Sequence, residues 1–323
     1  MLKILLPEPE SFNEKCQAIL KKIGDLTAKR MTRNQLLKVI KDYDILVIRL
    51  KTTVDKKLVD RAKRLKIIAT ATTGTDHIDE KYAKIKKIKI VSLKGEDEFL
   101  KNVNASTEHV FALLLSLIRK VPWCFEYIKK GYWEKDRFFG TELFGKTIGI
   151  VGFGRIGRKV ARLSLAFGMK VLAYDPYVNY DEIRNNGVNL VDFKKLLENS
   201  DIILVSVSLT PETIKMFSIK EFRLMKKKPY FINISRGQVV DERALLKALK
   251  ENMIRGAALD VIDKETKCEN PIKNNPLRMY AIKHDNLLIT SHIAGSTLES
   301  MEMTGIFIAN KIKELLEQSS INT

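Results

Sequence analysis

The sequence predicts an α/β protein that consists of two doubly wound parallel-sheet domains. Short apolar segments alternate with longer amphipathic, lysine-rich segments along the whole chain. This alternation is typical of parallel strands that are connected by helices. A length of 323 residues is also more than one ordinary hydrophobic core holds, and it indicates about two domains.

The N-terminal part of the chain contains a first series of expected strands. Each is a short apolar segment, and helical segments such as 12–23 and 56–62 separate them. The expected strands are 3–6, 45–48, 67–70 and 90–92. A longer segment, 105–117, is apolar around most of its circumference as a helix, which predicts a buried helix or an oligomer interface.

A second series of strands and helices begins near Lys146. Its expected strands are 147–151, 170–174, 202–207, 230–234, 256–259 and 287–290. We expect a last helix at 298–316, which returns to pack on the first domain. No internal repeat or low-complexity segment interrupts this pattern.

The composition bears on partners and location. The net charge is +18, but the lysines are scattered without a basic, aromatic-interleaved motif, so we expect solvated helix faces rather than nucleic-acid binding. No apolar run reaches about 18 residues, and we expect no membrane span. Because Cys16, Cys124 and Cys268 lack metal-ligand spacing, we expect no metal site and a reducing, cytoplasmic location.

The expected strand 147–151 leads directly into a glycine-rich turn, GFGRIG, at 152–157. Gly152 permits a tight turn, Gly154 lets the backbone approach a pyrophosphate, and Gly157 lets the following helix lie close to the strand. The helix N-terminus presents N–H groups and a positive dipole end to phosphates. The pattern predicts a dinucleotide-binding turn.

An acidic residue strengthens this interpretation. The next expected strand ends at Asp175, 18 residues after Gly157. A carboxylate there accepts hydrogen bonds from the adenosine ribose hydroxyls and repels a 2′-phosphate. The residues that follow, Pro176 and Tyr177, are not arginines, so NAD is favoured over NADP. A structural glycine turn followed by an ordinary acid is the alternative.

Three later segments, each at the expected carboxyl end of a strand, carry Arg236, Glu265 and His292. Open α/β sheets bind ligands at this edge. An arginine can hold a carboxylate in a bidentate fork and polarise a carbonyl. A histidine can exchange a hydroxyl proton near neutral pH, and a paired glutamate would stabilise its imidazolium.

Each of these three residues also has a structural explanation: a salt bridge, a solvated acid or a hydrogen-bonded core histidine. Their order after successive strands favours the catalytic interpretation. The rival histidines are His77, His109 and His284.

The chain resembles the D-isomer-specific 2-hydroxyacid dehydrogenases along nearly its whole length. The motifs that carry the resemblance are 73–76, 152–157, 209–213, 231–237, 260–265 and 292–296. The resemblance implies hydride transfer between NAD and C2 of a small 2-hydroxy or 2-oxo acid. It also implies a Rossmann domain, 102–295, inserted into a flavodoxin-like substrate domain, 1–101 with 296–323.

The resemblance further implies roles for individual residues. Arg236 binds the substrate carboxylate and carbonyl, His292 is the acid/base, and Glu265 is its partner. The amides of Thr73 and Gly74 hold the substrate carboxylate. The implied cofactor residues are Gly152, Gly154, Arg155, Ile156, Gly157, Asp175, Pro176, Thr107, Ser206, Val207, Thr213, Ile234, Asp260, His292, Ala294 and Gly295.

The identity of the substrate is open. Arg49 and Lys51 stand where the family contacts distal substrate groups, and two cations favour an anionic tail such as the phosphate of 3-phosphoglycerate. Surface charge is the equal alternative, and glyoxylate, hydroxypyruvate and D-lactate are other candidate substrates. Thr72, Ser206 and Thr266 depart from residues frequent in the family and leave the subgroup undecided. Since the sequence stops at Thr323, we expect no appended regulatory domain.

Two further interpretations concern function and assembly. The family includes corepressors that keep the arginine, glutamate and histidine, so an NAD(H)-sensing binding protein is the alternative function. The resemblance implies a homodimer interface at 105–117 and the aromatic residues after it, with packing between the domains as the alternative. These aromatic residues are Trp123, Phe125, Tyr132 and Trp133.

Overall fold

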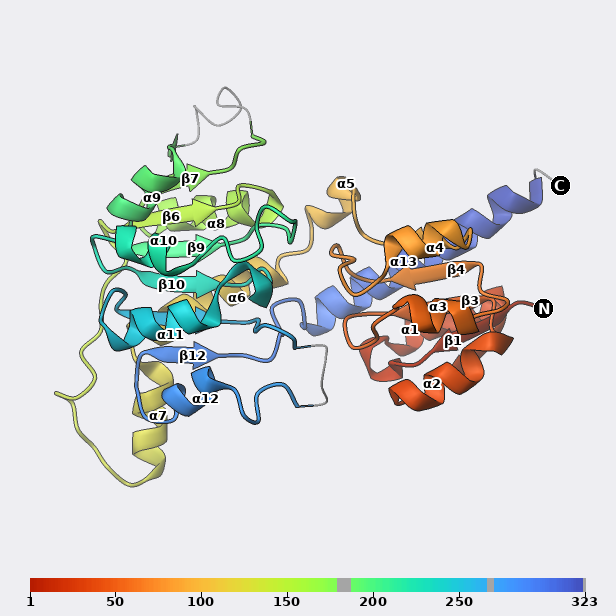
Figure 1. Cartoon of the computed structure of the whole chain (residues 1–323), viewed down its shortest axis with the longest axis horizontal. Coiled ribbons are helices and arrows are strands. Elements are labelled where there is room, and N and C mark those ends of the chain that lie inside the picture. Colours follow the sequence, from red (N-terminus) through yellow and green to blue (C-terminus); the bar gives the residue numbers. More distant parts are fainter. Residues whose placement is uncertain (179–186, 266–269, 322–323) are drawn as a thin grey trace. The chain divides into compact units, whose positions relative to one another are not determined.

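Figure 1 shows the computed structural model, which describes residues 1–178, 187–265 and 270–321. The chain divides by its internal contacts into unit 1, Met1–Val103 with Ser296–Thr323, and unit 2, Asn104–Gly295. The expected boundaries, after residues 101 and 295, lie close to these. Thr266 and Cys268 lie outside the described residues.

Unit 1 contains a five-stranded parallel sheet with the strand order β2-β1-β3-β4-β5. Three strands have the expected bounds, namely β1 (Lys3–Leu6), β3 (Ile45–Ile48) and β4 (Ile67–Thr70). β5 (Lys89–Val91) begins and ends one residue earlier than expected. The sequence pattern does not reveal β2 (Asp25–Ala28), because this partly exposed edge strand has no apolar run.

Helices cover both faces of this sheet. They are α1 (Glu14–Ile23), α2 (Arg33–Val39), α3 (Lys56–Arg61), α4 (Glu80–Ile85), α5 (Asp97–Leu100) and α13 (Leu298–Ile321), with short 3-10 turns η1 (Pro9–Ser11) and η2 (Ile40–Asp42). Ile4 and Leu6 pack in one core with residues of α1 and α13. Leu5 packs in a second core with residues of α2, α3 and α4. The expected return of the last helix to the first part of the chain is confirmed.

Unit 2 contains a seven-stranded parallel sheet with the order β12-β11-β10-β9-β6-β7-β8. Its strands are β6 (Thr147–Val151), β7 (Lys170–Tyr174), β8 (Val188–Leu190), β9 (Ile202–Val205), β10 (Tyr230–Asn233), β11 (Gly256–Leu259) and β12 (Leu287–Ile289). β6 lies between β7 and β9, so the strand order reverses there. Open α/β sheets bind ligands at the carboxyl ends of strands at such a reversal.

The helices of unit 2 also form two layers, one on each face of the sheet (Figure 1). They are α6 (Ala105–Ile118), α7 (Val121–Lys129), α8 (Arg155–Ala166), α9 (Phe193–Asn199), α10 (Ile219–Leu224), α11 (Glu242–Lys250) and α12 (Pro276–Ala281), with a 3-10 turn η4 (Gly237–Val239). α6 and α8 share one core, and α9 to α12 share the other. The segment 105–117 is a buried helix, which is one of the two alternatives that its sequence predicted.

Three strands of unit 2 end earlier than expected. β9, β10 and β12 stop at Val205, Asn233 and Ile289, one or two residues before the predicted ends. At the end of β10 the ladder opens, because the hydrogen bond from Ile234 N to Val205 O is 3.4 Å long. The residues that were expected to end these strands therefore lie in loops. They are Ser206, Val207, Ile234 and Thr290.

Candidate active site

The glycine-rich turn follows β6, at the point where the strand order reverses. Gly152 has a φ of +93°, and a Cβ there would lie 2.8 Å from the backbone of Ser206. A Cβ on Gly157 would lie 2.4 Å from the carbonyl oxygen of Gly152, so α8 approaches the turn closely. A Cβ on Gly154 would meet nothing within 4 Å. The turn thus requires glycine for two different reasons and leaves open space beside Gly154.

The start of α8 and the end of β7 complete this region. No side chain caps the N-terminus of α8 at Gly154, so the positive end of the helix dipole faces the open space. Asp175 follows β7, and its Oδ2 accepts a hydrogen bond of 2.8 Å from Phe153 N. Its Oδ1 accepts one of 3.0 Å from Tyr177 N. Asp175 therefore fixes the glycine turn as well as standing beside it.

Other predicted cofactor residues shape the same edge. Ser206 Oγ donates to Gly152 O at 2.8 Å, which ties the loop after β9 to the turn. Thr213 Oγ1 accepts from Thr210 N and donates to Ser208 O, both at 2.8 Å, which closes its own loop. The Oγ1 atom of Thr107 is buried and has no hydrogen-bond partner in the described part of the chain. Such an atom suits a polar ligand.

The predicted histidine and glutamate form a pair. His292 Nδ1 is 2.5 Å from Glu265 Oε1, and the two side chains are 21% and 20% exposed. Glu265 Oε2 is in turn 3.4 Å from Ile262 N. Because Nδ1 faces the glutamate, Nε2 is the ring nitrogen that can exchange a proton with a ligand. The pair has the chemistry of a general acid/base that a carboxylate orients.

Asp260 anchors the segment that carries His292. Its Oδ1 accepts from Ile293 N at 2.9 Å, and its Oδ2 accepts from Ala294 N at 2.8 Å. Burial alone would raise the pKa of Asp260, but hydrogen bonds from His109, Thr290 and these two amides hold it below its usual value. The carboxylate therefore stays ionised.

Arg236 follows β10, and its Nη1 donates to Ser235 O at 2.9 Å. The next residue, Gly237, lies so close to the loop after β11 that a Cβ would be 2.0 Å from Ile262 C. Unit 2 thus brings the Arg236 loop against the loop that leads to Glu265. Hydrogen bonds also join Glu265 to His292, and His292 N to the carbonyl oxygen of Asp260.

The predicted substrate residues of unit 1 follow β3 and β4. Arg49 donates from Nε to Ser11 O, from Nη1 to Ala71 O, and from Nη2 to Met301 O and Thr304 Oγ1. Burial lowers the pKa of the Arg49 guanidinium to about 10, so it remains cationic at neutral pH. Four of its five N–H donors are therefore engaged within unit 1, and a contact with substrate stays a prediction.

The other residues of this edge are more accessible. Lys51 Nζ is 2.8 Å from Glu10 Oε1, and both side chains are largely exposed. Thr72 Oγ1 donates to Gly74 O at 2.7 Å, so the departure from glycine at 72 adds a bond that fixes the loop. Thr73 is exposed beside it. The roles of Lys51, Thr73 and Gly74 stay predictions.

Sequence reasoning missed two polar residues that the structure places at the candidate site. Thr290 is hidden within an expected strand, although it lies in a loop and contacts Asp260. His109 is named only as a rival histidine. Its position as an imidazole on an otherwise apolar helix was the signal that could have found it.

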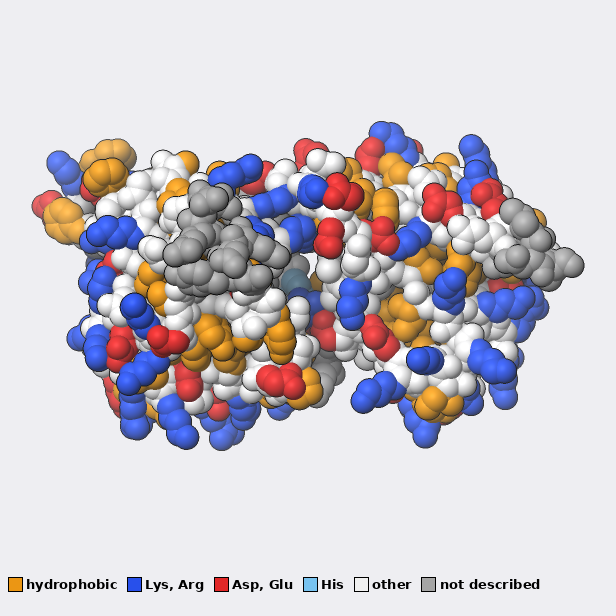
Figure 2. Space-filling view, turned by 90° about the horizontal axis from the view of Figure 1, so that it is seen from above, with side chains coloured by type: hydrophobic (Ala, Val, Ile, Leu, Met, Phe, Trp, Pro, Cys, Tyr) orange, Lys and Arg blue, Asp and Glu red, His pale blue; other side chains and the backbone are white. Residues whose placement is uncertain are grey.

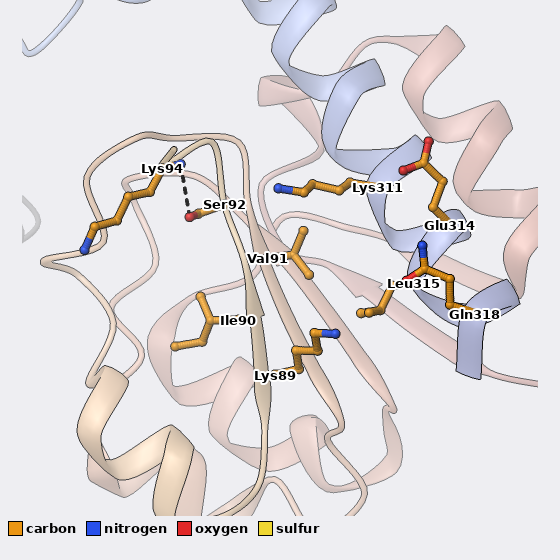
Figure 3. A pocket seen from close by; sticks show the side chains of 9 residues that line it. All are labelled: Lys89, Ile90, Val91, Ser92, Lys94, Lys311, Glu314, Leu315 and Gln318. Atoms are coloured by element: carbon orange, nitrogen blue, oxygen red, sulfur yellow. Dashed lines mark hydrogen bonds between the residues drawn. The ribbon is translucent and has the colours of Figure 1, made fainter. Parts of the chain in front are cut away.

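Other features of the surface do not compete with this site. A shallow pocket of unit 1 lies between β5 and α13 (Figure 3). Its lysines stand beside β5, an edge strand, and Lys311 pairs with Glu96. Such lysines protect an edge from pairing with other chains. Figure 2 shows basic side chains spread over the face in view, with acidic ones between them. Within the described residues, no helix has the length and apolarity to span a membrane, and no histidine, cysteine or acidic group forms a metal cluster.

Comparison with known proteins identifies the family. Residues 111–294 match the family model of the D-isomer specific 2-hydroxyacid dehydrogenase, NAD binding domain. The D-3-phosphoglycerate dehydrogenase of Methanocaldococcus jannaschii is 37% identical over 318 residues, which are 98% of this chain and 58% of that protein. The glyoxylate reductase of Pyrococcus furiosus is 35% identical over 291 residues, which are 88% and 82% of the two chains.

A solved structure agrees with these matches. The D-lactate dehydrogenase of Aquifex aeolicus, complexed with NAD and lactic acid, has a TM-score of 0.85 at 29% identity and covers 98% of this chain. The chain spans a little over half the length of the D-3-phosphoglycerate dehydrogenases of M. jannaschii and Archaeoglobus fulgidus, 58% and 56%. The resemblance drawn from the motifs is confirmed, and the chain belongs to the D-isomer-specific 2-hydroxyacid dehydrogenases, with the NAD binding domain of that family in unit 2.

Proposed function

We propose that the chain is an NAD-dependent D-2-hydroxyacid dehydrogenase or 2-oxoacid reductase with His292 as its acid/base. The observation that carries this proposal is the hydrogen bond between His292 Nδ1 and Glu265 Oε1, 2.5 Å long, at the carboxyl edge of the dinucleotide-type sheet. Family membership and the glycine turn fit the cofactor, and the pair supplies the proton chemistry.

The residues of the chain divide the work as follows. His292 takes the proton of the C2 hydroxyl at Nε2 during oxidation and returns it during reduction. Glu265 holds the ring at Nδ1 and stabilises the imidazolium. Arg236 holds the substrate carboxylate and polarises the C2 carbonyl. The amides of Thr73 and Gly74 are further proposed contacts of the substrate.

The proposed NAD site fits the residues that are present. NAD, when bound, supplies the hydride acceptor or donor at C4 of its nicotinamide. The open space beside Gly154 and the uncapped start of α8 suit a pyrophosphate. Asp175 would accept the ribose hydroxyls, and the buried Thr107 hydroxyl would gain a partner. Further proposed contacts are Arg155, Ile156, Pro176, Ser206, Val207, Thr213, Ile234, Asp260, Ala294 and Gly295.

We propose a substrate with an anionic tail, of the 3-phosphoglycerate type. Several relatives are named D-3-phosphoglycerate dehydrogenases, while others are named glyoxylate or hydroxypyruvate reductases. The exposed ammonium of Lys51 supports a distal anionic contact, since its present partner, Glu10, is also on the surface. A surface pair of this kind is worth at most about 1 kcal/mol, so a substrate can replace it.

We also propose a homodimer and a cytoplasmic location. α7 and the segment after it expose large apolar side chains, with Phe125 61% and Trp133 88% exposed. An apolar surface of this kind is typical of an interface between subunits. Cys16 and Cys124 are free thiols, as a reducing compartment favours. Sedimentation of a 37.0 kDa monomer at micromolar concentration would contradict the dimer.

A screen of NADH consumption over small 2-oxo acids, with and without a phosphate group, tests the proposed function. We expect turnover of at least one 2-oxo acid, with the lowest KM for a phosphorylated one. If no 2-oxo acid is turned over, the proposed enzymatic activity is contradicted and the NAD(H)-sensing alternative is favoured. A steep salt dependence of DNA binding in the same preparation would then support that alternative.

A further inference from the structure

A partly buried cluster in unit 2 joins His109 to the segment that carries His292. His109 lies on α6, and its Nε2 is 3.2 Å from Asp260 Oδ1 and 3.2 Å from Thr290 Oγ1. Thr290 Oγ1 is 2.7 Å from Asp260 Oδ1. The side chain of His109 is 15% exposed and that of Asp260 is fully buried. The imidazole thus completes a hydrogen-bond network with Asp260 and Thr290, next to the segment that carries His292.

The hydrogen bonds of the network determine which ring nitrogen of His109 carries a hydrogen. The ionised Asp260 carboxylate only accepts hydrogen bonds, and the single hydrogen of the Thr290 hydroxyl points to that carboxylate. Both oxygens near His109 Nε2 are therefore acceptors. It follows that Nε2 carries a hydrogen and that His109 donates in its neutral form as well as its charged form.

Asp260 in turn holds three consecutive backbone N–H groups. His292 N donates to the Asp260 carbonyl at 2.8 Å, while Ile293 N and Ala294 N donate to its carboxylate at 2.9 and 2.8 Å. His292 has a φ of 56°, a left-handed conformation that costs a residue other than glycine on the order of 1 kcal/mol. These bonds offset that cost, so the orientation of His292 depends on the position of Asp260.

The network also lies near both points where the chain passes from one unit to the other. The first crossing is Val103 to Asn104, and α6 begins immediately afterwards at Ala105. The second crossing is Gly295 to Ser296, directly after Ala294. One carboxylate therefore receives hydrogen bonds from the unit 2 side of both connections.

We propose that His109 is a positioning residue, which fixes Asp260 and Thr290 so that the 290–294 segment presents His292 Nε2 to the substrate. The proposal rests on the proposed function, in which His292 is the acid/base. His109 acts only through Asp260 and Thr290 and donates one hydrogen bond to them. A side chain that restores a donor at the same place should therefore replace it.

Two substitutions test this requirement. His109→Leu keeps an apolar body of similar reach but has no donor, whereas His109→Gln places an amide N–H near the position of Nε2. We expect His109→Leu to lower kcat by about 10- to 100-fold, as small misplacements of a catalytic group do, with the KM for the 2-oxo acid changed less than about threefold. We expect His109→Gln to recover kcat to within about fivefold of the parent enzyme.

A double-mutant cycle with His292→Ala separates positioning from general damage. If His109 acts through His292, His109→Leu should lower kcat no further in the His292→Ala background. An equal further loss in that background, or a kcat of His109→Leu within twofold of the parent, would overturn the proposal. A parental kcat in His292→Ala alone would instead refute the proposed function.

A readout without turnover keeps the proposal testable if no substrate is found. The chain has four histidines, so the imidazole NMR signals of His292 can be assigned by their loss in His292→Ala. We expect these signals to shift or broaden in His109→Leu and to match the parent protein in His109→Gln. Unchanged His292 signals in a folded His109→Leu protein would refute the proposal.

Discussion

The carboxyl edges of the two sheets use charged side chains in different ways. In unit 1 a partly buried cation, Arg49, donates hydrogen bonds to oxygen atoms of four residues. In unit 2 acidic residues hold the loops instead, because Asp175 and Asp260 accept hydrogen bonds from backbone N–H groups. Unit 2 adds to this a partly exposed pair of a histidine and a glutamate, His292 and Glu265.

The difference shows that a charge at a strand end does not by itself identify a catalytic residue. Asp260 is fully buried and Arg49 is partly exposed, and both make their hydrogen bonds within the protein. The side chains of His292 and Glu265 are each about one fifth exposed, and Nδ1 of the imidazole is hydrogen-bonded to the glutamate. The proposed chemistry therefore rests on a partly exposed imidazole that a carboxylate orients, whereas Arg49 and Asp260 support the loops.

The largest effect is expected at His292, the residue of unit 2 to which we assign the proton chemistry. His292→Ala should lower kcat by about 10²- to 10⁴-fold, because the acid/base is lost while the loops remain. Steady-state NADH oxidation measures it. The control is His284→Ala, since His284 stacks on Tyr280 and belongs to no proposed contact, and its kcat should stay within about twofold of the parent. Equal losses of kcat in the two variants would contradict the assignment of His292 as the acid/base.

The second prediction concerns Arg49, the hydrogen-bonded cation of unit 1. Arg49→Met should lower the free energy of unfolding by about 2–4 kcal/mol, because four acceptors lose their donor. Urea unfolding measures it. Lys51→Met provides the matched control and should change stability by less than about 0.5 kcal/mol, since its ion pair is exposed. If Arg49→Met kept full stability and raised the substrate KM instead, Arg49 would belong with the substrate-binding residues.

A smaller effect is expected at Asp175, which combines support with proposed binding. Asp175→Ala should raise the KM for NADH by about 10- to 100-fold, as the loss of hydrogen bonds to a charged group does, and should narrow the preference for NADH over NADPH. Initial rates with both cofactors measure the two quantities. An unchanged cofactor preference would leave Asp175 only its structural role, the hydrogen bonds from Phe153 N and Tyr177 N.

The smallest effect is a pH dependence at Asp260. Its pKa in the folded protein is held below the usual value of 3.8 by hydrogen bonds that outweigh burial. It therefore contributes stability above pH 4 that is lost as the pH falls through the folded pKa. Asp260→Asn should be less stable than the parent at pH 6 and should lose less stability between pH 6 and pH 3. Urea unfolding at both values checks this, and parallel losses in the two proteins would contradict it.

The expected strands with continuous apolar runs agree with the structure because burial on both faces leaves a strong pattern. Ile45–Ile48 and Thr147–Val151 are examples. The edge strands β2 and β8 escaped prediction because a strand that is partly exposed needs no apolar run. The early ends of β9, β10 and β12 also escaped, since an apolar residue such as Ile234 continues the pattern after the ladder has opened.

The sequence by itself determined the family, the parallel α/β class, the glycine turn with Asp175, and the order of Arg236, Glu265 and His292. These features are local, because a turn or a strand end depends on neighbouring residues. Only the tertiary structure decided which charges meet. It engaged Arg49 within unit 1 and connected His109 to Asp260 across 151 residues of sequence. Such contacts depend on which strand ends lie side by side, and no local pattern encodes that.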